Sequence, residues 1–282
     1  MQGRVSRAHE AAKRSLVYGR RAGRPHEEAC VGNVLETTLG GPIPAAEGLR
    51  SCEEFVREAR GDRWLESTAL CFLASHEALL GRFADARVHM GQAKVVLQEL
   101  GLKQGEGIAF LYSGGVEALA GDPAAAEREL RAAVEIFRDN GDRWFASFTL
   151  VGLARALYEQ GRYEEARRLA DAFDETPAPF DVAWRAQTRG VRARLLAREG
   201  RSLEAETLAT EAAAIVAPTE VVNVRTAVLM DLAEVLLLGG DAAGAATAAG
   251  EALELYERKG NVASAARVQS FLAGLRSGAG AA

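Results

Sequence analysis

Hydrophobic residues recur every three or four positions, as they do on one face of an α-helix, in stretches of about fifteen to twenty residues. Thr, Val and Ile are too sparse and too irregularly placed to indicate a sheet. The pattern predicts helices at residues 4–22, 26–39, 44–59, 63–80, 83–99, 104–120, 123–139, 143–160, 163–174, 181–199, 202–216, 220–238, 242–259 and 262–275. We therefore expect an all-α protein of about fourteen helices.

A repeat of about forty residues organises these helices. A glycine followed five residues later by an alanine recurs at spacings of 38 to 40 residues, as Gly3/Ala8, Gly41/Ala46, Gly81/Ala86, Gly121/Ala126, Gly161/Ala166, Gly200/Ala205 and Gly240/Ala245. One apolar stretch precedes each glycine and another follows it, so the glycine marks the turn of a two-helix unit. The sequence therefore predicts stacked antiparallel helix pairs.

Small residues and tryptophans follow the same register. Seven residues before the glycine stand Ala74, Gly114, Ala154, Ala193 and Ala233, and twelve after it stand Ala93, Ala133, Ala212 and Ala252. The three tryptophans, Trp64, Trp144 and Trp184, lie sixteen or seventeen residues before their glycine. We expect the small residues where two helices touch closely, and we interpret the tryptophans as residues of the repeat.

The segments Gly-Arg-Phe-Ala-Asp-Ala at 81–86 and Gly-Arg-Tyr-Glu-Glu-Ala at 161–166, with the small residues around them, resemble the tetratricopeptide repeat (TPR). The period of about forty residues exceeds the usual period of roughly 34 and implies longer helices. Repeats of this length resemble the C-terminal TPR regions of bacterial LuxR-type and cyclase-linked ATPase regulators, above all over residues 231–267. The resemblance implies a right-handed α-solenoid that binds protein or peptide.

The phase of the repeat predicts a single solenoid over residues 1–275. It comprises a half repeat at 1–22, pairs at 26–59, 63–99, 104–139, 143–174, 181–216 and 220–259, a capping helix at 262–275 and a flexible tail at 276–282. The first helix lacks a preceding partner for Val5, Ala8, Ala12, Leu16 and Val17. We expect that the chain is the C-terminal part of a longer architecture; the alternatives are that a symmetric partner chain supplies the missing helix, in a homodimer, or that this helix frays.

Composition and local motifs argue against membrane insertion and catalysis. The formal charge of −5 is mild, no long apolar stretch could span a bilayer, and no secretory signal opens the chain, so we expect a cytoplasmic protein. His76-Glu77 begins like a zinc-protease motif, but Leu80 stands where the second histidine is required. Phosphate loops, nucleophile elbows and Cys-x-x-Cys pairs are missing from the sequence. We therefore predict no catalytic, cofactor or metal site, and no enzyme activity.

The binding face is predicted from the register, because the first helix of each pair lines the concave side of such a solenoid. The candidate peptide-binding residues on that face are Phe148, Val151, Arg155, Tyr158, Gln187, Arg194 and Arg198. The arginines could bind carboxylates of an acidic segment or of a chain terminus. Internal pairing with Glu159, Glu199 or Glu234 would explain the same arginines without a ligand.

The start of the chain is basic, with seven Arg or Lys residues and a single acidic residue, Glu10, within residues 1–25. A helix of this kind could bind nucleic acid, and this is the alternative function. A solvated helix beside acidic neighbours is the simpler interpretation, because aromatic residues that stack on bases are nearly missing from it. We therefore expect a protein or peptide partner rather than nucleic acid.

The repeat pattern and the resemblance together predict that the protein is a non-enzymatic binding scaffold. We expect it to serve as the sensor or docking module of a larger bacterial signalling or transcriptional regulator. Its expected partners are a protein or peptide and an upstream ATPase or DNA-binding region that this chain lacks.

Overall fold

The computed structural model describes residues 4–22, 27–59, 61–172 and 182–279, which form helices and turns but no strand. The helices are α1 (Val5–Ala22), α2 (Glu27–Gly40), α3 (Ala45–Glu58), α4 (Arg63–Leu79), α5 (Phe83–Glu99), α6 (Lys103–Ala120), α7 (Pro123–Asp139), α8 (Arg143–Glu159), α9 (Tyr163–Asp171), α10 (Val182–Arg198), α11 (Ser202–Val216), α12 (Val222–Leu238), α13 (Ala242–Lys259) and α14 (Val262–Ala279). The prediction of an all-helical solenoid of fourteen helices is confirmed for the described residues.

Most helix bounds lie within two residues of those expected from the sequence. The exceptions are α9, which ends at Asp171, and α14, which continues to Ala279. Residues 276–279, expected in a flexible tail, are therefore helical. In these last turns the side chains of Arg276 and Ser277 donate to the carbonyls of Leu272 and Ala273, one turn earlier.

Glycines end helices about every twenty residues, twice as often as the forty-residue repeat alone requires. Positive φ angles occur at Gly61, Gly81, Gly101, Gly121, Gly141, Gly161, Gly200, Gly240 and Gly260. A residue without Cβ adopts this left-handed conformation at little cost, so it ends one helix and redirects the chain into the next. Several of the following helices begin with an aspartate cap; the Asp122 carboxylate, for example, accepts a hydrogen bond from the Ala125 amide at 2.8 Å.

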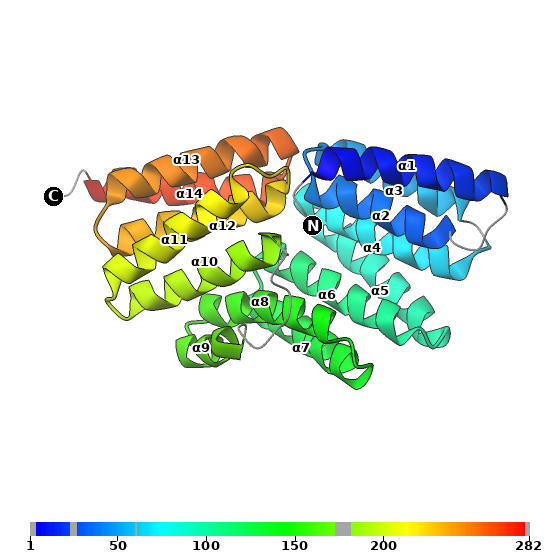
Figure 1. Cartoon of the computed structure of the whole chain (residues 1–282), viewed down its shortest axis with the longest axis horizontal. Coiled ribbons are helices and arrows are strands. Elements are labelled where there is room, and N and C mark those ends of the chain that lie inside the picture. The colour runs from blue at the N-terminus through cyan, green and yellow to red at the C-terminus, as the bar shows by residue number, and fades with distance from the viewer. Residues whose placement is uncertain (1–3, 23–26, 60, 173–181, 280–282) are drawn as a thin grey trace.

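Two layers of helices follow a curved path (Figure 1). The even-numbered helices contact one another in succession, α2 with α4, α4 with α6, and so on to α12, and form the inner layer. The odd-numbered helices from α3 to α13 pack outside them, each against its even-numbered neighbours. This two-layer arrangement places the first helix of each repeat on the inside of the curve.

Small residues lie where the helices of a pair approach most closely. The alanines of the repeat register are fully buried, namely Ala74, Ala93, Ala133, Ala154, Ala193, Ala212, Ala233 and Ala252. At Gly114 a Cβ atom would lie 2.5 Å from the Cγ of Leu130 on α7, nearer than packed carbons allow. The close approach expected from the sequence is therefore the basis of the packing.

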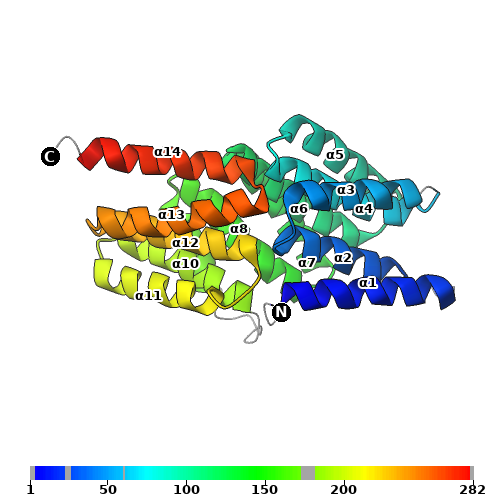
Figure 2. The same cartoon turned by 90° about the horizontal axis from the view of Figure 1, so that it is seen from above.

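The curved path brings the two ends of the solenoid together (Figures 1 and 2). Helix α12 contacts α2, and α14 contacts both α4 and α6. Helix α1 packs on α2 through Val5 and His9, which are buried, whereas Ala8 and Val17 are exposed and the side chain of Leu16 lies outside the described residues. The solenoid is thus a closed ring rather than an open arc.

Candidate functional site

The structure places the seven candidate residues on the inner helices α8 and α10. Val151, Tyr158 and Arg194 are buried, Phe148, Arg155 and Gln187 are half-buried, and Arg198 is exposed. The structure brings Arg155, Tyr158, Arg194 and Arg198 together with three carboxylates, those of Glu159, Asp231 and Glu234. Phe148 lies more than two helical turns from Tyr158 on α8 and belongs to a different part of the face.

Arg155 and Asp231 form a bidentate ion pair from α8 to α12. The two Nη atoms of Arg155 donate to the two carboxylate oxygens of Asp231 at 2.7 and 2.5 Å. Asp231 is 2% exposed, so Arg155 rather than water compensates its carboxylate. At Gly190 on α10, a Cβ atom would lie 2.1 Å from Oδ2 of Asp231. The absence of a side chain at Gly190 therefore makes room for the ion pair.

Arg194 lies at the centre of this cluster of arginines and carboxylates. Its Nε donates to Glu234 and its Nη2 to Glu159, both at 2.7 Å, and its guanidinium carbon lies 3.9 Å from the centroid of the Tyr158 ring. Burial opposes the charge of Arg194, but the carboxylates of Asp231, Glu234 and Glu159 outweigh burial and raise its pKa. Arg194 is therefore a charged residue held inside the protein by its own chain.

Tyr158 links Arg198 to Glu234. Its hydroxyl donates to Glu234 at 2.6 Å and accepts from the Nε of Arg198 at 2.9 Å. Burial, together with the bond to Glu234, raises the pKa of Tyr158 to about 12, so the hydroxyl stays protonated. Burial would raise the pKa of Glu234, but Arg194 and the hydrogen bonds from Tyr158 and Arg198 lower it. Glu234 is thus ionised at neutral pH.

The charges of this group cancel. Three arginines, at 155, 194 and 198, face three carboxylates, those of Glu159, Asp231 and Glu234. The internal pairing that the sequence left open as an alternative is present in the structure for Glu159 and Glu234, whereas Glu199 pairs with Arg167 and Arg201. Asp231 was not among the expected partners, because nothing in the local sequence indicates that this residue of α12 lies beside Gly190 of α10.

An aromatic pair occupies the other end of the inner face of α8. The rings of Trp144 and Phe148 stack with centroids 5.8 Å apart and planes 10° apart. Trp144 is 46% exposed, although sequence reasoning treated it only as a residue of the repeat. Aromatic residues at the surface are enriched in binding interfaces, because they bury a large area with little loss of conformational freedom.

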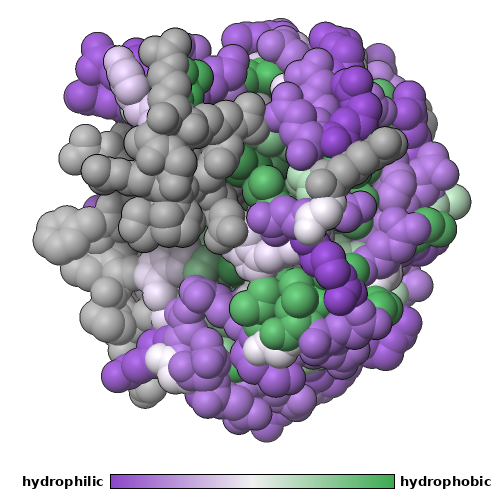
Figure 3. Space-filling model, turned by 90° about the vertical axis from the view of Figure 1, so that its right-hand side faces the viewer, coloured by the Kyte–Doolittle hydropathy of each residue, from purple (hydrophilic) through white to green (hydrophobic). Residues whose placement is uncertain are grey.

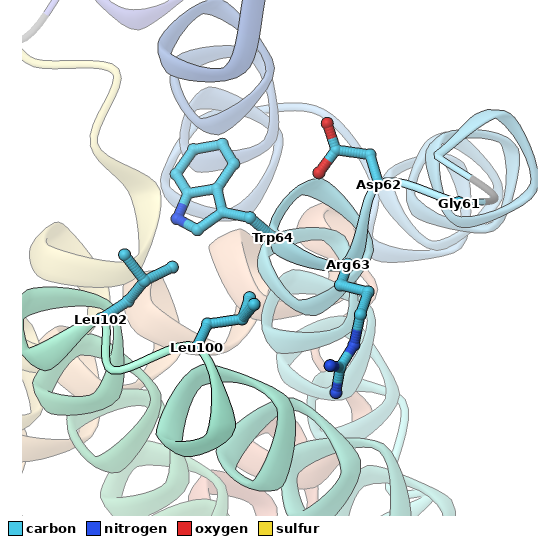
Figure 4. A pocket seen from close by; sticks show the side chains of 6 residues that line it. All are labelled: Gly61, Asp62, Arg63, Trp64, Leu100 and Leu102. Atoms are coloured by element: carbon cyan, nitrogen blue, oxygen red, sulfur yellow. The ribbon is translucent and has the colours of Figure 1, made fainter.

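A second feature is a shallow hollow of about 810 Å³ on the turns that precede α4 and α6. Figure 4 shows Trp64, Leu100 and Leu102 around the open space, with Arg63 directed away from it. This end of the molecule carries separate hydrophobic areas among hydrophilic surface (Figure 3). The hollow is too open to enclose a small molecule, so it offers at most a flat contact.

The basic residues of the first helix are placed but not gathered into a site. Arg4, Arg7, Lys13 and Arg14 are exposed on or just before α1. The side chains of Arg20 and Arg21, and the whole of Arg24, lie outside the described residues. Exposure is what both the nucleic-acid hypothesis and the solvated-helix interpretation predict, so it does not distinguish them.

Metal and membrane sites were searched over the described part of the chain. No group of three or more His, Cys, Asp or Glu in it could hold a metal ion. Within the same residues, no helix combines the length and the apolar character needed to cross a bilayer.

Comparisons with known proteins agree with this geometry. Residues 106–171, which span α6 to α9, match the family model described as tetratricopeptide repeat. No curated protein sequence matches the chain significantly. Among solved structures, a tetratricopeptide repeat protein from Parabacteroides merdae has a TM-score of 0.51 at 17% identity, and the match covers 91% of each chain.

Two further structures contain ligands. A Rap protein complexed with Competence and Sporulation Factor matches with a TM-score of 0.56 at 14% identity, over 89% of this chain and 64% of that one. NprR in complex with its cognate peptide NprX matches with a TM-score of 0.56 at 13% identity, over 80% and 68%. At these identities the likeness shows the fold alone. The chain therefore carries tetratricopeptide repeats at residues 106–171, within a helical solenoid whose fold is similar to that of these solved proteins.

Proposed function

We propose that the chain is a non-enzymatic scaffold that binds a protein or peptide through the inner face of α8 and α10. The observation that carries the proposal is the half-buried ring of Phe148 beside exposed Trp144 on the same inner wall as Arg198. Aromatic and arginine side chains on a rigid concave wall supply the anchors on which peptide recognition usually depends.

Accessible side chains define the first contacts in this proposal. Phe148, Gln187 and Arg198 are reachable from solvent, and they form the binding set. Arg155, Tyr158 and Arg194 position that set, because their own hydrogen bonds hold α8, α10 and α12 together. Buried Val151 supports the wall from behind. A ligand carboxylate would compete with Glu234 for Arg198, the most exposed of the three arginines.

Related folds support a peptide ligand. NprR and the Rap protein were each solved with a bound peptide or factor, and both share the solenoid arrangement of this chain. The likeness of residues 231–267 to the C-terminal regions of LuxR-type and cyclase-linked regulators extends the proposal. In that role the scaffold is the sensor or docking module of a bacterial regulator and couples a bound peptide to an ATPase or DNA-binding region.

A displayed library of short peptides tests the proposal. Selected peptides would be synthesised, and their affinity measured by fluorescence anisotropy. We expect Phe148→Ala and Arg198→Ala each to weaken binding by about tenfold or more, as loss of an interface anchor does. Leu203→Ala on α11 and Arg201→Ala before it are the matched controls, because both residues are exposed outside the inner wall. Peptides that bind both inner-wall variants as well as they bind the wild type would contradict the site.

A further inference from the structure

The seam that closes the ring is made by polar contacts between the two ends of the chain. Asn223 on α12 donates to the carbonyl of Leu39 at 2.9 Å, and Arg267 on α14 donates to the carbonyl of Ala118 at 2.9 Å. The backbone amide of Ser6 donates to the Glu220 carboxylate at 2.7 Å. Each of these bonds joins residues that are about 150 or more positions apart in the sequence.

Lys259 is the centre of this seam. Its ammonium donates to the carbonyls of Thr38, Gly41 and Ile43 at 2.6, 2.8 and 2.6 Å, at and beyond the end of α2. All three N–H groups are thereby used, and the positive charge faces the negative end of the α2 dipole. The side chain is 1% exposed, and burial lowers the pKa of Lys259 to about 8. The same surroundings, chiefly burial, lower the pKa of His76 to about 3 and keep it neutral.

The apolar core does not cross the seam. One cluster of buried hydrophobic residues extends from Val31 to Val116, and another from Leu229 to Val268. Among the described residues, no such cluster includes members from both ends. Neighbouring repeats, in contrast, share continuous apolar clusters. The seam therefore lacks the stabilisation that burial of apolar surface provides elsewhere in the solenoid.

The energetics of Lys259 favour a contact that can open. Removing an ammonium from water is costly, and its three hydrogen bonds to carbonyls repay that cost only in part, as the lowered pKa indicates. When the seam opens, the ammonium and the three carbonyls all regain water. An interface that is polar and small resembles those between domains that move relative to one another.

We infer that the contact of α12–α14 with α2, α4 and α6 is a clasp that opens reversibly and, when closed, weakens the binding of a partner to the inner wall, where Phe148 and Gln187 are only half exposed. The second part rests on the proposed function, because it concerns the same inner wall. The first part is independent of any partner. Opening separates the ends held at Lys259 and widens the ring, while each half keeps its own apolar core.

The first experiment measures opening without a ligand. Lys259→Met removes the charge and the three donors but retains most of the side-chain volume; Arg258→Met, at the exposed neighbouring position, is the matched control. By small-angle X-ray scattering we expect a larger radius of gyration for Lys259→Met at unchanged helix content, and a wild-type value for Arg258→Met. A folded Lys259→Met protein with the scattering of the wild type would overturn the clasp.

The second experiment locks the ring. A Cβ atom at Gly260 would lie 3.9 Å from the Cβ of Ala45, which is within the range of a disulfide. Ala45→Cys with Gly260→Cys therefore gives a staple that oxidation closes and reduction releases. The positive φ of Gly260 strains a cysteine at this position, but it strains the oxidised and reduced forms alike, so the comparison between the two forms stays valid. Two of the three native cysteines, Cys52 and Cys71, are buried, and burial raises their pKa values, so they interfere little; the third, Cys30, would be replaced by alanine in every staple variant.

The stapled protein separates the two parts of the inference. With a peptide selected on the inner wall, we expect the oxidised form to lose at least tenfold in affinity and reduction to restore it. Equal affinity of the oxidised and reduced forms would overturn the autoinhibitory role. If no peptide binds either form, the proposed function fails, while the scattering result still decides whether the clasp opens. If Lys259→Met does not fold, opening is decided by hydrogen exchange at the amides of residues 40–45, which should be slower in the oxidised than in the reduced staple.

Discussion

Arg155 on α8 and Asp231 on α12 form a two-point ion pair across 76 residues of sequence. The pair joins inner helices that are two repeats apart, because the ring curves tightly enough to bring α12 within reach of α8. A side chain of α10, between them, would obstruct the pair if Gly190 carried a Cβ. The packing of the three successive inner helices α8, α10 and α12 therefore involves the one buried carboxylate of Asp231.

Removing Arg155 should reveal that dependence. Arg155→Met leaves Asp231 buried without its main partner, and we expect a loss of about 3 kcal/mol in the free energy of unfolding. This value is at the lower end of the range for breaking a buried ion pair, because the Nη1 of Arg194, 3.7 Å from Oδ1 of Asp231, still compensates part of the carboxylate charge. Urea unfolding followed by circular dichroism measures the change.

The exposed pair Arg201–Glu204 supplies the control for this measurement. Arg201→Met should cost less than about 0.5 kcal/mol, since solvent screens exposed pairs. Adding Asp231→Leu to Arg155→Met should restore part of the lost stability, because no charge then remains unpaired. Equal losses for Arg155→Met and Arg201→Met would contradict the buried-pair interpretation.

Two glycines of inner helices should respond to alanine in opposite directions. In Gly190→Ala the new Cβ must displace the Asp231 carboxylate, and we expect a loss of about 2 kcal/mol. At Gly115 on α6 nothing lies within 4 Å of the Cβ position, so Gly115→Ala should gain roughly 0.5–1 kcal/mol from helix propensity. Unfolding by urea compares the two, and a gain in Gly190→Ala would refute the steric argument.

His76 should make the protein sensitive to mild acid. Its ring packs on α3, where a Cβ at Gly48 would lie 2.2 Å from Cε1, and Nε2 lies 3.1 Å from Oγ1 of Thr38. Because the Thr38 hydroxyl donates to the carbonyl of Leu35, the His76 Nε2–H must be the donor of this bond. Nδ1 then carries no proton, and it has no hydrogen-bond partner among the described residues.

The sign of the pH effect follows from the pKa values. Burial, with a smaller contribution from Lys259, lowers the pKa of His76 from 6.5 to about 3, so the unfolded state binds more protons between these values. Stability contributed by neutral His76 is present above pH 6.5 and is lost as the pH falls towards 3. Between pH 7 and pH 5 we expect His76→Gln to lose about 2 kcal/mol less than the wild type. Identical losses in the two proteins would show that His76 does not titrate on unfolding.

Glu36 should show the opposite dependence. Burial raises the pKa of Glu36, although the hydroxyl of Tyr112 on α6 donates to its carboxylate and lowers the pKa in part. A raised pKa in the folded state means that the contribution of Glu36 to stability is largest below about pH 4.5 and falls as the pH rises through the folded pKa. Relative to the wild type, Glu36→Gln should therefore be more stable at pH 7 than at pH 4.

A control separates charge from the hydrogen bond at this position. Glu36→Ala removes both and leaves the Tyr112 hydroxyl without its acceptor, so it should be destabilised at both pH values. Thermal melts at pH 4 and pH 7 provide the comparison. A stability difference between Glu36→Gln and the wild type that does not change with pH would contradict the assignment.

The candidate site was only partly accessible to sequence reasoning. The register of the repeat predicted which helices form the inner layer, and it predicted the face of α8 and α10 that carries Phe148, Arg155 and Arg194, since the helix phase follows from the glycine that ends each helix. The pairing of those arginines was left open, because the choice between a ligand and an internal carboxylate depends on how tightly the ring curves. Small changes in the angle between successive pairs, summed over several repeats, decide whether α12 reaches α8.

Local signals determined the helices and their order. Glycines in the left-handed conformation, aspartate caps and small residues act within one unit, so the chain itself specified where each helix begins, where it turns and which face it buries. The closure of the ring is different in kind. In the sequence, Lys259 is a basic residue in the last turn of a predicted helix, where a solvated charge is usual. Only the tertiary structure places it against the carbonyls of residues 38–43, more than two hundred positions away, because that contact depends on the accumulated curvature of the whole solenoid.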